Sequence, residues 1–293
     1  MDPVYCPRRR EFLMAPLAAF AAPAPRKSFN NPFFALCMDT HDEKKRSLAE
    51  QAELLKELGY DGAGHLWLDG VEERLATLDK AGLRLFQVYV RLDIKPGAKQ
   101  VYDPRLKDVL PMLKGRGVTL ATLITGGTPS DEARDPEVVA LVKEIAGMAQ
   151  PHGVRVALYH HRSDWLEKVE DCVRLARKVA RPDVGAMFNL CHWLRVGEES
   201  QMKPLLKAAT PHLLAVTVNG TDRGAEIKSG KGNWIQPLDG GSFDIHGFLA
   251  ALQEMGYDGP IGLQCYGIRG DARLHLARSI AAWRKLRERL NAG

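Results

Sequence analysis

Short apolar runs recur along the chain from residue 33 onward, and an amphipathic stretch with helical spacing follows most of them. This alternation is typical of repeated strand–helix units. Glycine-containing turn signals stand where amphipathic stretches must end, at 58–62, 80–82, 115–117 and 255–260. The predicted strands are Phe33–Met38, Gly62–Leu68, Leu85–Leu92, Val118–Thr125, Val154–His160, Val184–Leu190, Leu213–Asn219 and Ile261–Tyr266. The predicted helices are Asp42–Leu58, Gly70–Ala81, Pro104–Lys114, Asp135–Met148, Ser163–Val179, Met202–Ala208, Ile245–Met255 and Asp271–Leu290.

Eight strand–helix units match an α/β fold of the (β/α)8 TIM barrel type in number and in total length. A doubly wound sheet needs fewer units, and no G-x-G-x-x-G motif follows a predicted strand. We therefore expect residues 27–293 to form a single barrel domain. Catalytic groups of such barrels lie at the C-terminal ends of the strands.

Residues 1–26 have the pattern of an export signal. The run Arg9-Arg10-Glu11-Phe12-Leu13 fits the twin-arginine pattern R-R-x-F-L, a short apolar stretch follows, and Ala19-Phe20-Ala21 offers a cleavage site. The apolar stretch is too short to cross about 30 Å of hydrocarbon. We expect a periplasmic or secreted protein, the alternative being a basic extension on a cytoplasmic one. No other segment has 18 apolar residues, so no membrane span is expected in the mature chain.

This interpretation predicts that the double change Arg9→Lys/Arg10→Lys traps the precursor in the cytoplasm, because export by this route requires the arginine pair. Cell fractionation and N-terminal sequencing measure it, and the mature chain should begin near Ala22. Periplasmic protein that still carries Met1 would contradict it.

Composition and charge exclude several classes of protein. Apolar residues make up 45% and charged residues 26% of the chain, which is ordinary for a globular protein. The net charge of +5 is spread without a run of five basic residues, so no nucleic-acid partner is expected. Five cysteines without a CxxC pair make neither a disulfide framework nor a zinc ribbon. We interpret Cys37, Cys172, Cys191 and Cys265 as buried apolar residues.

Alternation along the predicted strands places polar side chains inside the barrel. Large apolar residues should face the helices, so the residues between them face the axis. A layer of small residues, Ala157, Gly185 and Gly262, would leave room above it for a ligand the size of a sugar ring. The polar residues expected on the inner face near the C-terminal end are Gln87, Tyr89, Arg91, Tyr159, His161, Asn189, Thr217, Asn219, Gln264 and Tyr266.

Histidines also gather at this end of the predicted strands. His41, His160, His161 and His192 fall at or just beyond strand ends, and His65 lies midway along one. A single histidine there is usually a surface or hydrogen-bonded structural residue. Four of them at the functional rim indicate that at least two belong to a site.

Several of these segments carry a family resemblance. They are Tyr60-Asp61-Gly62, the strand 154–158, Asn189-Leu190-Cys191-His192 and, as the most specific one, the tail GYDGPIGLQCY at 256–266. From about Phe34 to Leu286 the chain resembles the xylose isomerase-like barrels of the sugar phosphate isomerase/epimerase superfamily. The resemblance implies a barrel that acts on a small carbohydrate. It also implies that His192 and Arg223 match positions that contact substrate oxygens.

The resemblance further implies one divalent metal held by Glu, Asp, His and Glu at four strand ends. The matching positions here are Tyr159, Asn189, Thr217 (or Asn219) and Gln264, so every charged ligand is replaced. Neutral amides compensate little of the charge of a hard cation. We therefore predict no cofactor and no metal at these positions, although the resemblance leaves a divalent ion as the alternative. In that alternative the ion would be bound at a relocated site made of His65, His161 and His192, since imidazoles suit zinc or manganese.

The function expected is a sugar or keto-sugar isomerase or epimerase that abstracts a proton next to a carbonyl. His161 or His192 would be the base and Tyr159 its acid partner. Arg91 or Arg223 would polarise the carbonyl. The residues expected to bind other parts of the substrate are His65, Tyr89, Asn189, Asn219, Gln264 and, by stacking from the long loop 220–244, Trp234.

Three alternatives stay open from the residues. The barrel could be a non-catalytic carbohydrate-binding protein, or a lyase or hydratase acting on keto-sugars. In the third, Tyr159, Asn189 and Gln264 bond to each other and fill the lumen as a hydrogen-bonded plug, because unpaired buried amides cost about 1–3 kcal/mol each. The partner expected is a small-molecule carbohydrate, and a second copy of the chain is an additional candidate.

Overall fold

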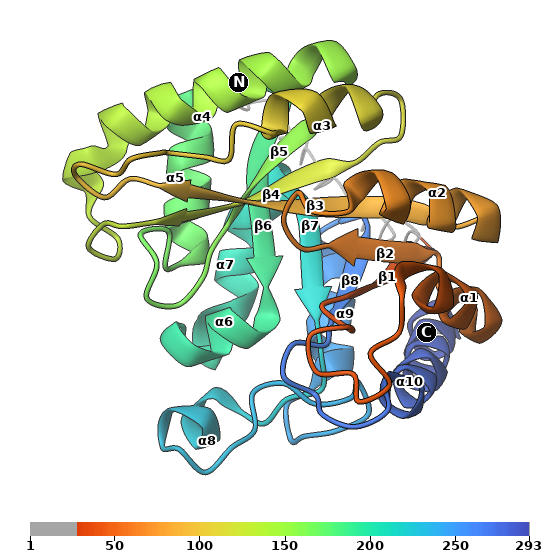
Figure 1. Cartoon of the computed structure of the whole chain (residues 1–293). Coiled ribbons are helices and arrows are strands. Elements are labelled where there is room, and N and C mark those ends of the chain that lie inside the picture. Colours follow the sequence, from red (N-terminus) through yellow and green to blue (C-terminus); the bar gives the residue numbers. More distant parts are fainter. Residues whose placement is uncertain (1–27, 293) are drawn as a thin grey trace, which may run out of the picture.

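The computed structural model of the protein describes residues 28–292 and is a closed barrel of parallel strands (Figure 1). Each strand pairs with its neighbour in sequence, and β1 pairs with β8 to close the sheet. The predicted single-domain TIM barrel is confirmed. The strands are β1 (Phe33–Leu36), β2 (Gly62–His65), β3 (Arg84–Asp93), β4 (Thr119–Thr125), β5 (Arg155–Tyr159), β6 (Val184–Asn189), β7 (Leu213–Val218) and β8 (Ile261–Gln264).

Helices connect successive strands and surround the sheet (Figure 1). The helices are α1 (Leu48–Leu58), α2 (Val71–Ala81), α3 (Leu106–Met112), α4 (Asp135–Ala149), α5 (Val169–Val179), α6 (Leu190–Val196), α7 (Met202–Ala209), α8 (Gly224–Lys228), α9 (Ile245–Glu254) and α10 (Ala272–Ala292). Local sequence explains where they begin and end. Ser47 and Glu50 form a capping box at the start of α1, and Gly59, with a left-handed φ of 83°, ends it.

The alternation of side chains across the strands separates two apolar clusters. Leu158, Phe188 and Leu263 face the helices and belong to the larger cluster, which is the main core. Tyr89, Tyr159 and other residues that alternate with them form a smaller cluster inside the barrel. The predicted facing of these strands is confirmed, so the sequence pattern located the interior of the barrel.

The glycines in the layer of small residues are closely packed by large side chains. A Cβ atom added to Gly262 would lie 2.7 Å from the ring of Phe34, and one added to Gly185 would lie 2.6 Å from Leu214. Phe34 in turn stacks on Phe86, with ring centroids 4.8 Å apart. Large side chains from neighbouring strands therefore fill the space beside these glycines, and open space lies only nearer the C-terminal ends of the strands.

Two of the stretches that differ from the prediction lie near the site. The strand predicted to run to Leu190 ends at Asn189, and α6, which was not predicted, begins at the next residue. The helix predicted from Ser163 begins only at Val169, because 161–166 make a turn in which the His161 amide donates to the Leu166 carbonyl. Both differences place short segments beside the barrel mouth.

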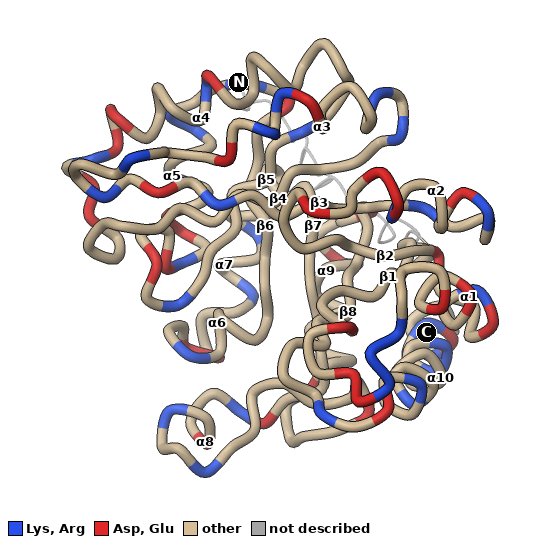
Figure 2. Tube along the Cα trace, in the orientation of Figure 1, with Lys and Arg blue, Asp and Glu red and all other residues tan. Residues whose placement is uncertain are grey.

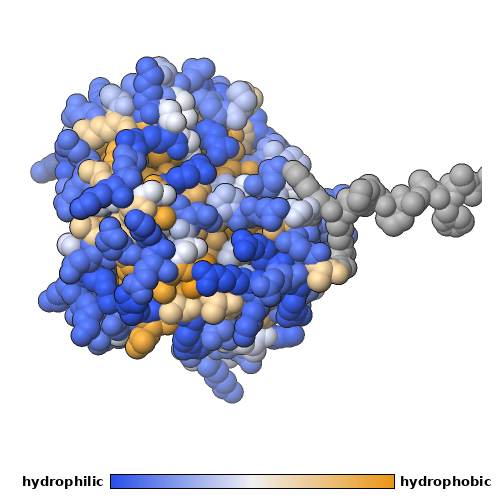
Figure 3. Space-filling model, turned by 90° about the vertical axis from the view of Figure 1, so that its right-hand side faces the viewer, coloured by the Kyte–Doolittle hydropathy of each residue, from blue (hydrophilic) through white to orange (hydrophobic). Residues whose placement is uncertain are grey.

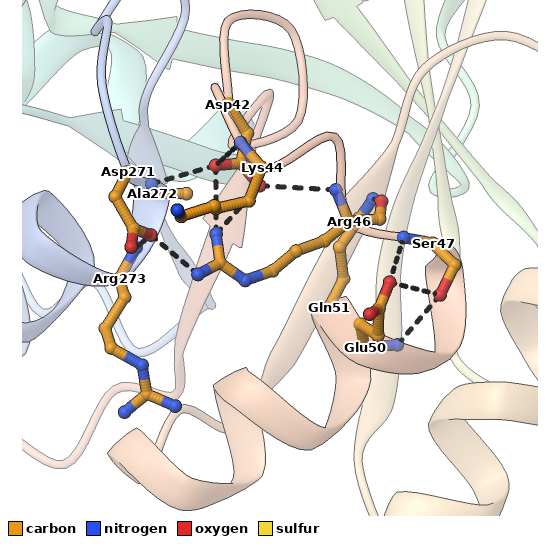
Figure 4. A network of polar contacts seen from close by, with 9 residues as sticks. All are labelled: Asp42, Lys44, Arg46, Ser47, Glu50, Gln51, Asp271, Ala272 and Arg273. Atoms are coloured by element: carbon orange, nitrogen blue, oxygen red, sulfur yellow. Dashed lines mark hydrogen bonds and ion pairs between the residues drawn. The ribbon is translucent and has the colours of Figure 1, made fainter.

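Polar contacts join the first and last strand–helix units (Figure 4). The Arg46 guanidinium donates to both Asp42 oxygens at 2.9 Å and to Asp271 Oδ1 at 2.6 Å. Asp42 also accepts the Ala272 amide at 3.1 Å, which is at the start of α10. Together these contacts form a clasp of residues 42–46 and 271–272 that holds the β1–α1 loop against the last helix.

The surface is polar and mixed in charge. Basic and acidic residues alternate along most helices and loops (Figure 2). On the face in Figure 3 hydrophilic residues predominate, with hydrophobic residues in small groups between them. None of the helices within 28–292 is long and apolar enough to cross a membrane. Cys37, Cys172, Cys191 and Cys265 are free and buried, as interpreted. The predicted export signal at 1–26 lies outside the described residues.

Candidate functional site

A cavity of about 620 Å³ opens at the C-terminal end of the barrel. It adjoins a second cavity of about 790 Å³, and Trp67, Tyr89 and Arg91 line both. Of the residues predicted for the site, seven line the first cavity: Tyr89, Arg91, Tyr159, His161, His192, Trp234 and Gln264. The structure therefore brings together side chains from five strand ends, at the edge where barrel enzymes carry their active sites.

Two histidines form a pair on one wall of this cavity. The ring centroids of His161 and His192 are 4.0 Å apart. His161 Nδ1 lies 3.3 Å from Asp164 Oδ2, and the His161 side chain is 38% exposed. His192 is only 4% exposed. His161 is thus an accessible imidazole with a carboxylate at ion-pair distance from its Nδ1, a pairing suited to general base chemistry.

His192 is held neutral by its surroundings. Burial lowers its pKa well below the usual value, and the nearby His161, His160 and Arg195 lower it further. Two imidazolium ions 4.0 Å apart in a partly dry site would repel each other. His192 is therefore not the member of the pair that takes up a proton.

Tyr159 and Gln264 form the cavity floor, and Asn189 lies beneath it. Asn189 Nδ2 donates to the Tyr159 hydroxyl. Burial raises the pKa of Tyr159 well above the usual value, mainly through loss of hydration. Tyr159 therefore stays protonated at neutral pH. Asn189 itself is fully buried beneath the cavity rather than lining it.

His160 supports this floor from the opposite side of β5. It is fully buried, and its Nε2 accepts the backbone amide of Asn189 at 2.9 Å, so it must be neutral. Burial is the main reason that its pKa is lowered to about 4. His160 positions Asn189 and has no access to the cavity.

A measurable pH dependence follows from His160. The unfolded chain binds a proton near pH 6.5 and the folded chain only near pH 4, so the free energy of unfolding should fall as pH falls between these values. The expected loss from this residue is about 3 kcal/mol. Urea unfolding at several pH values measures it, and His160→Gln should flatten the slope, whereas His246→Gln on α9 should not. An unchanged slope in His160→Gln would contradict the assignment.

Besides Asn189, three of the predicted site residues lie outside the cavity lining. Gly64 faces the interior, where an added Cβ would meet Leu36, so His65 faces the helices and bonds the Asp69 carbonyl. Asn219 follows the end of β7 and donates to the carbonyls of Gly220 and Trp234, so it anchors the loop that carries Trp234.

Arg223 is the third of them. It is exposed and precedes α8, where its backbone amide bonds Glu226. The cavity therefore takes its guanidinium groups from other positions, and Arg223 has no place in the chemistry proposed below.

Two charged residues of the cavity were missed from the sequence. Asp164 follows His161 by three residues, and Arg195 follows His192 by three. The second spacing is one helical turn, so it would have been a signal had α6 been predicted. The spacing of His161 and Asp164 arises in an irregular turn, for which the sequence offers no periodic signal.

The four positions that match the family's metal ligands do not fit a divalent ion. Asn189 Oδ1 accepts a bond from Cys191 Sγ at 2.9 Å, and the amide nitrogen, which is no ligand, points to Tyr159. Tyr159, held protonated, and Gln264 provide no charged oxygen. A relocated site is also wrong, because His65 faces the helices. Residues 28–292 contain no group of three or more His, Cys, Asp or Glu able to hold a metal.

Comparisons with known proteins agree with this architecture. D-allulose 3-epimerase from Methylomonas sp. aligns at 16% identity over 89% of this chain and 100% of its own, with a TM-score of 0.67. A xylose isomerase-like TIM barrel protein from Mycobacterium smegmatis, in complex with magnesium, aligns at 16% identity. The alignment covers 91% of this chain and 99% of that protein, with a TM-score of 0.66. The probable 3-DHS dehydratase AsbF from Bacillus anthracis aligns at 14% identity over 86% of this chain and 98% of its own, with a TM-score of 0.67. At such identities the likeness shows a fold shared with sugar epimerases and a dehydratase.

No curated protein matches the chain by sequence. The family model described as xylose isomerase-like TIM barrel, however, matches residues 52–289, which is most of the chain. The match includes seven of the eight strands and the whole histidine pair. The chain therefore belongs to the xylose isomerase-like TIM barrel family.

Proposed function

We propose that the protein is a sugar isomerase or epimerase that abstracts a proton next to the carbonyl of a keto-sugar, without the divalent ion of its relatives. The pair of His161 and His192, with Asp164 behind it, is the observation that carries this proposal. It supplies a base in a family whose metal-binding and acid–base carboxylates are replaced here by Tyr159 and Gln264. The cavity sets a few polar side chains among apolar and aromatic ones, a lining that suits a small carbohydrate.

His161 is the proposed base. Its Nδ1 faces Asp164, so Nε2 is free to take a proton from a substrate carbon, and the carboxylate stabilises the resulting imidazolium. His192, kept neutral, holds the ring of His161 in place and does not compete for the proton.

Tyr159 is the proposed acid. As His161 removes the carbon-bound proton, the electron pair moves into a carbon–carbon double bond, and the carbonyl oxygen takes the Tyr159 proton to give an enediol. Return of the proton from His161 to the neighbouring carbon gives the isomer. Protonation of the original carbon on its opposite face by solvent, with His161 releasing its proton to water, gives the epimer. In both cases Tyr159 recovers a proton from the enediol hydroxyl that becomes the carbonyl. Arg91, which also lines the cavity, polarises the carbonyl, and Gln264 binds a hydroxyl.

Deuterium exchange in D2O is the direct test. The protein is dialysed against a chelator and incubated with a panel of ketohexoses and ketopentoses, and proton NMR follows loss of the signal next to the carbonyl. Exchange and isomer formation should occur and should not change on dialysis. Binding without exchange would instead identify a carbohydrate-binding barrel.

Two further outcomes of the same experiment are informative. Activity that is lost with the chelator and restored by Mg²⁺, Mn²⁺ or Zn²⁺ would overturn the metal-free part of the proposal. Loss of water from the substrate, seen as an unsaturated product, would identify a lyase, the reaction class that the dehydratase among the structural neighbours makes relevant. That result would keep the proton abstraction and change only the fate of the enediol.

A further inference from the structure

Two arginines line the cavity face-on to tryptophan rings. Arg195 Cζ lies 4.3 Å from the ring centroid of Trp234, and Arg91 Cζ lies 4.7 Å from that of Trp67. All four residues belong to the cavity lining. A guanidinium group that stacks through its flat face keeps its N–H edge available for a planar acceptor. Stacking on the tryptophan rings therefore orients the two guanidinium groups and leaves their N–H donors unused.

No acidic side chain in the described part of the chain forms an ion pair with either arginine. Other arginines behave differently: Arg46, Arg105 and Arg174 each pair with two or more carboxylates. Asp164 is the one acidic residue in the lining, and it faces His161. The cavity thus carries two cationic side chains, with its single carboxylate engaged elsewhere.

Arg195 is the more enclosed of the two. It lies on α6 one helical turn beyond His192, and its Trp234 partner is 5.8 Å from the His192 ring. Burial and the proximity of Arg162 lower its pKa, so the guanidinium lies beside a like charge. An anion bound at Arg195 would relieve this repulsion and would lie next to the histidine pair.

We propose that Arg195 binds a carboxylate of the substrate, so that the substrate is a sugar acid rather than a neutral sugar. This inference rests on the proposed function and specifies its substrate class. The guanidinium edge offers two parallel N–H donors, which match the two oxygens of a carboxylate. The sugar body then extends from Arg195 across His161 and Tyr159 toward Gln264.

The lining favours a carboxylate over a phosphate. Phosphate sites commonly add a lysine or a nest of free backbone amides to an arginine. The cavity lining has no lysine, and the amide of Asn189, just before α6, is already bonded to His160.

Matched pairs of ligands test the inference on the full chain by isothermal titration calorimetry. The probes are 2-keto-gluconate against fructose, glucuronate against glucose and galacturonate against galactose, with fructose 6-phosphate as the phosphate arm. At least one acid should bind about tenfold or more tightly than its neutral partner, because a charge-assisted bidentate contact is worth that much.

Arg195→Gln should remove most of this preference, and Arg195→Lys should restore part of it. Arg269→Gln is the matched control, because Arg269 is exposed on the loop before α10 and lies outside the cavity lining. Thermal unfolding verifies that each variant is folded. If Arg195→Gln unfolds, the comparison rests on Arg195→Lys, whose preference should still fall below that of the unmodified chain.

The outcomes separate this inference from the proposed function. Equal binding of acids and neutral sugars, or no binding of any acid, would overturn the carboxylate assignment even where neutral keto-sugars exchange their protons. Preferential binding of an acid without proton exchange would support it and overturn the proposed catalysis. Tightest binding of fructose 6-phosphate would replace the carboxylate with a phosphate and so contradict the inference.

Discussion

His161→Ala should lower the turnover of a keto-sugar by a factor of about 10²–10⁴, the usual contribution of a general base. The variant removes the only accessible imidazole of the pair and leaves Asp164 without its partner. The fold should change little, because the His161 side chain is 38% exposed and does not belong to either apolar cluster. Steady-state kinetics and thermal unfolding measure the two effects separately.

Two further variants sharpen this result. Asp164→Asn should lower turnover less than His161→Ala, because the base remains and only the carboxylate beside it is lost. His246→Ala on α9 is the control for removal of a histidine. If His161→Ala and His192→Ala both keep binding and turnover, and both destabilise the protein as a core change does, the polar lumen is a hydrogen-bonded plug and the proposed function fails.

Leu158→Ala should lower the free energy of unfolding by about 2–5 kcal/mol, the cost of a cavity left by a large apolar side chain. Leu158 is fully buried between β5 and the helices, one residue before Tyr159 on the opposite face of the strand. Turnover per folded molecule should stay near that of the unmodified chain. Urea unfolding measures the first quantity, and kinetics at low temperature measures the second.

Leu263→Ala on β8 should behave in the same way, because Leu263 is also fully buried in the main core. Leu274→Ala is the matched control, since the Leu274 side chain is 66% exposed on α10 and leaves no cavity. Loss of turnover without loss of stability in Leu158→Ala would mean that the faces of β5 are assigned the wrong way round.

The sequence predicted the barrel and the interior of its strands because both depend on simple periodicity. A strand that faces two environments has a period of two residues, so Leu158 and Tyr159 were assigned to opposite faces without knowledge of any contact. The same argument located Gln264 and His161 at the cavity. These residues lie in or directly after regular strands, where local pattern decides direction.

Prediction failed where the chain leaves the regular strand. β2 carries a register shift between Ala63 and Gly64, and the strand ends at His65, three residues before the predicted end. Trp67 then adopts a left-handed φ of 66°, which no pattern of apolar residues encodes. Asn219 does not line the cavity, and its side-chain amide, just beyond the strand end, bonds the carbonyls of Gly220 and Trp234. Such positions depend on contacts between segments that are distant in sequence.

The clasp of residues 42–46 and 271–272 has a consequence for how the protein is made. Phe33 on β1 stacks on Trp283 of α10 with ring centroids 4.1 Å apart, so the first and last elements complete each other. While the ribosome still holds the C-terminal segment, β1 presents an unpaired edge, which is where nascent chains aggregate. A premature stop after α9 would therefore remove β8 and open the whole sheet, rather than trim a peripheral helix. Such a chain should be a substrate for chaperones and proteases, however intact its first seven strands.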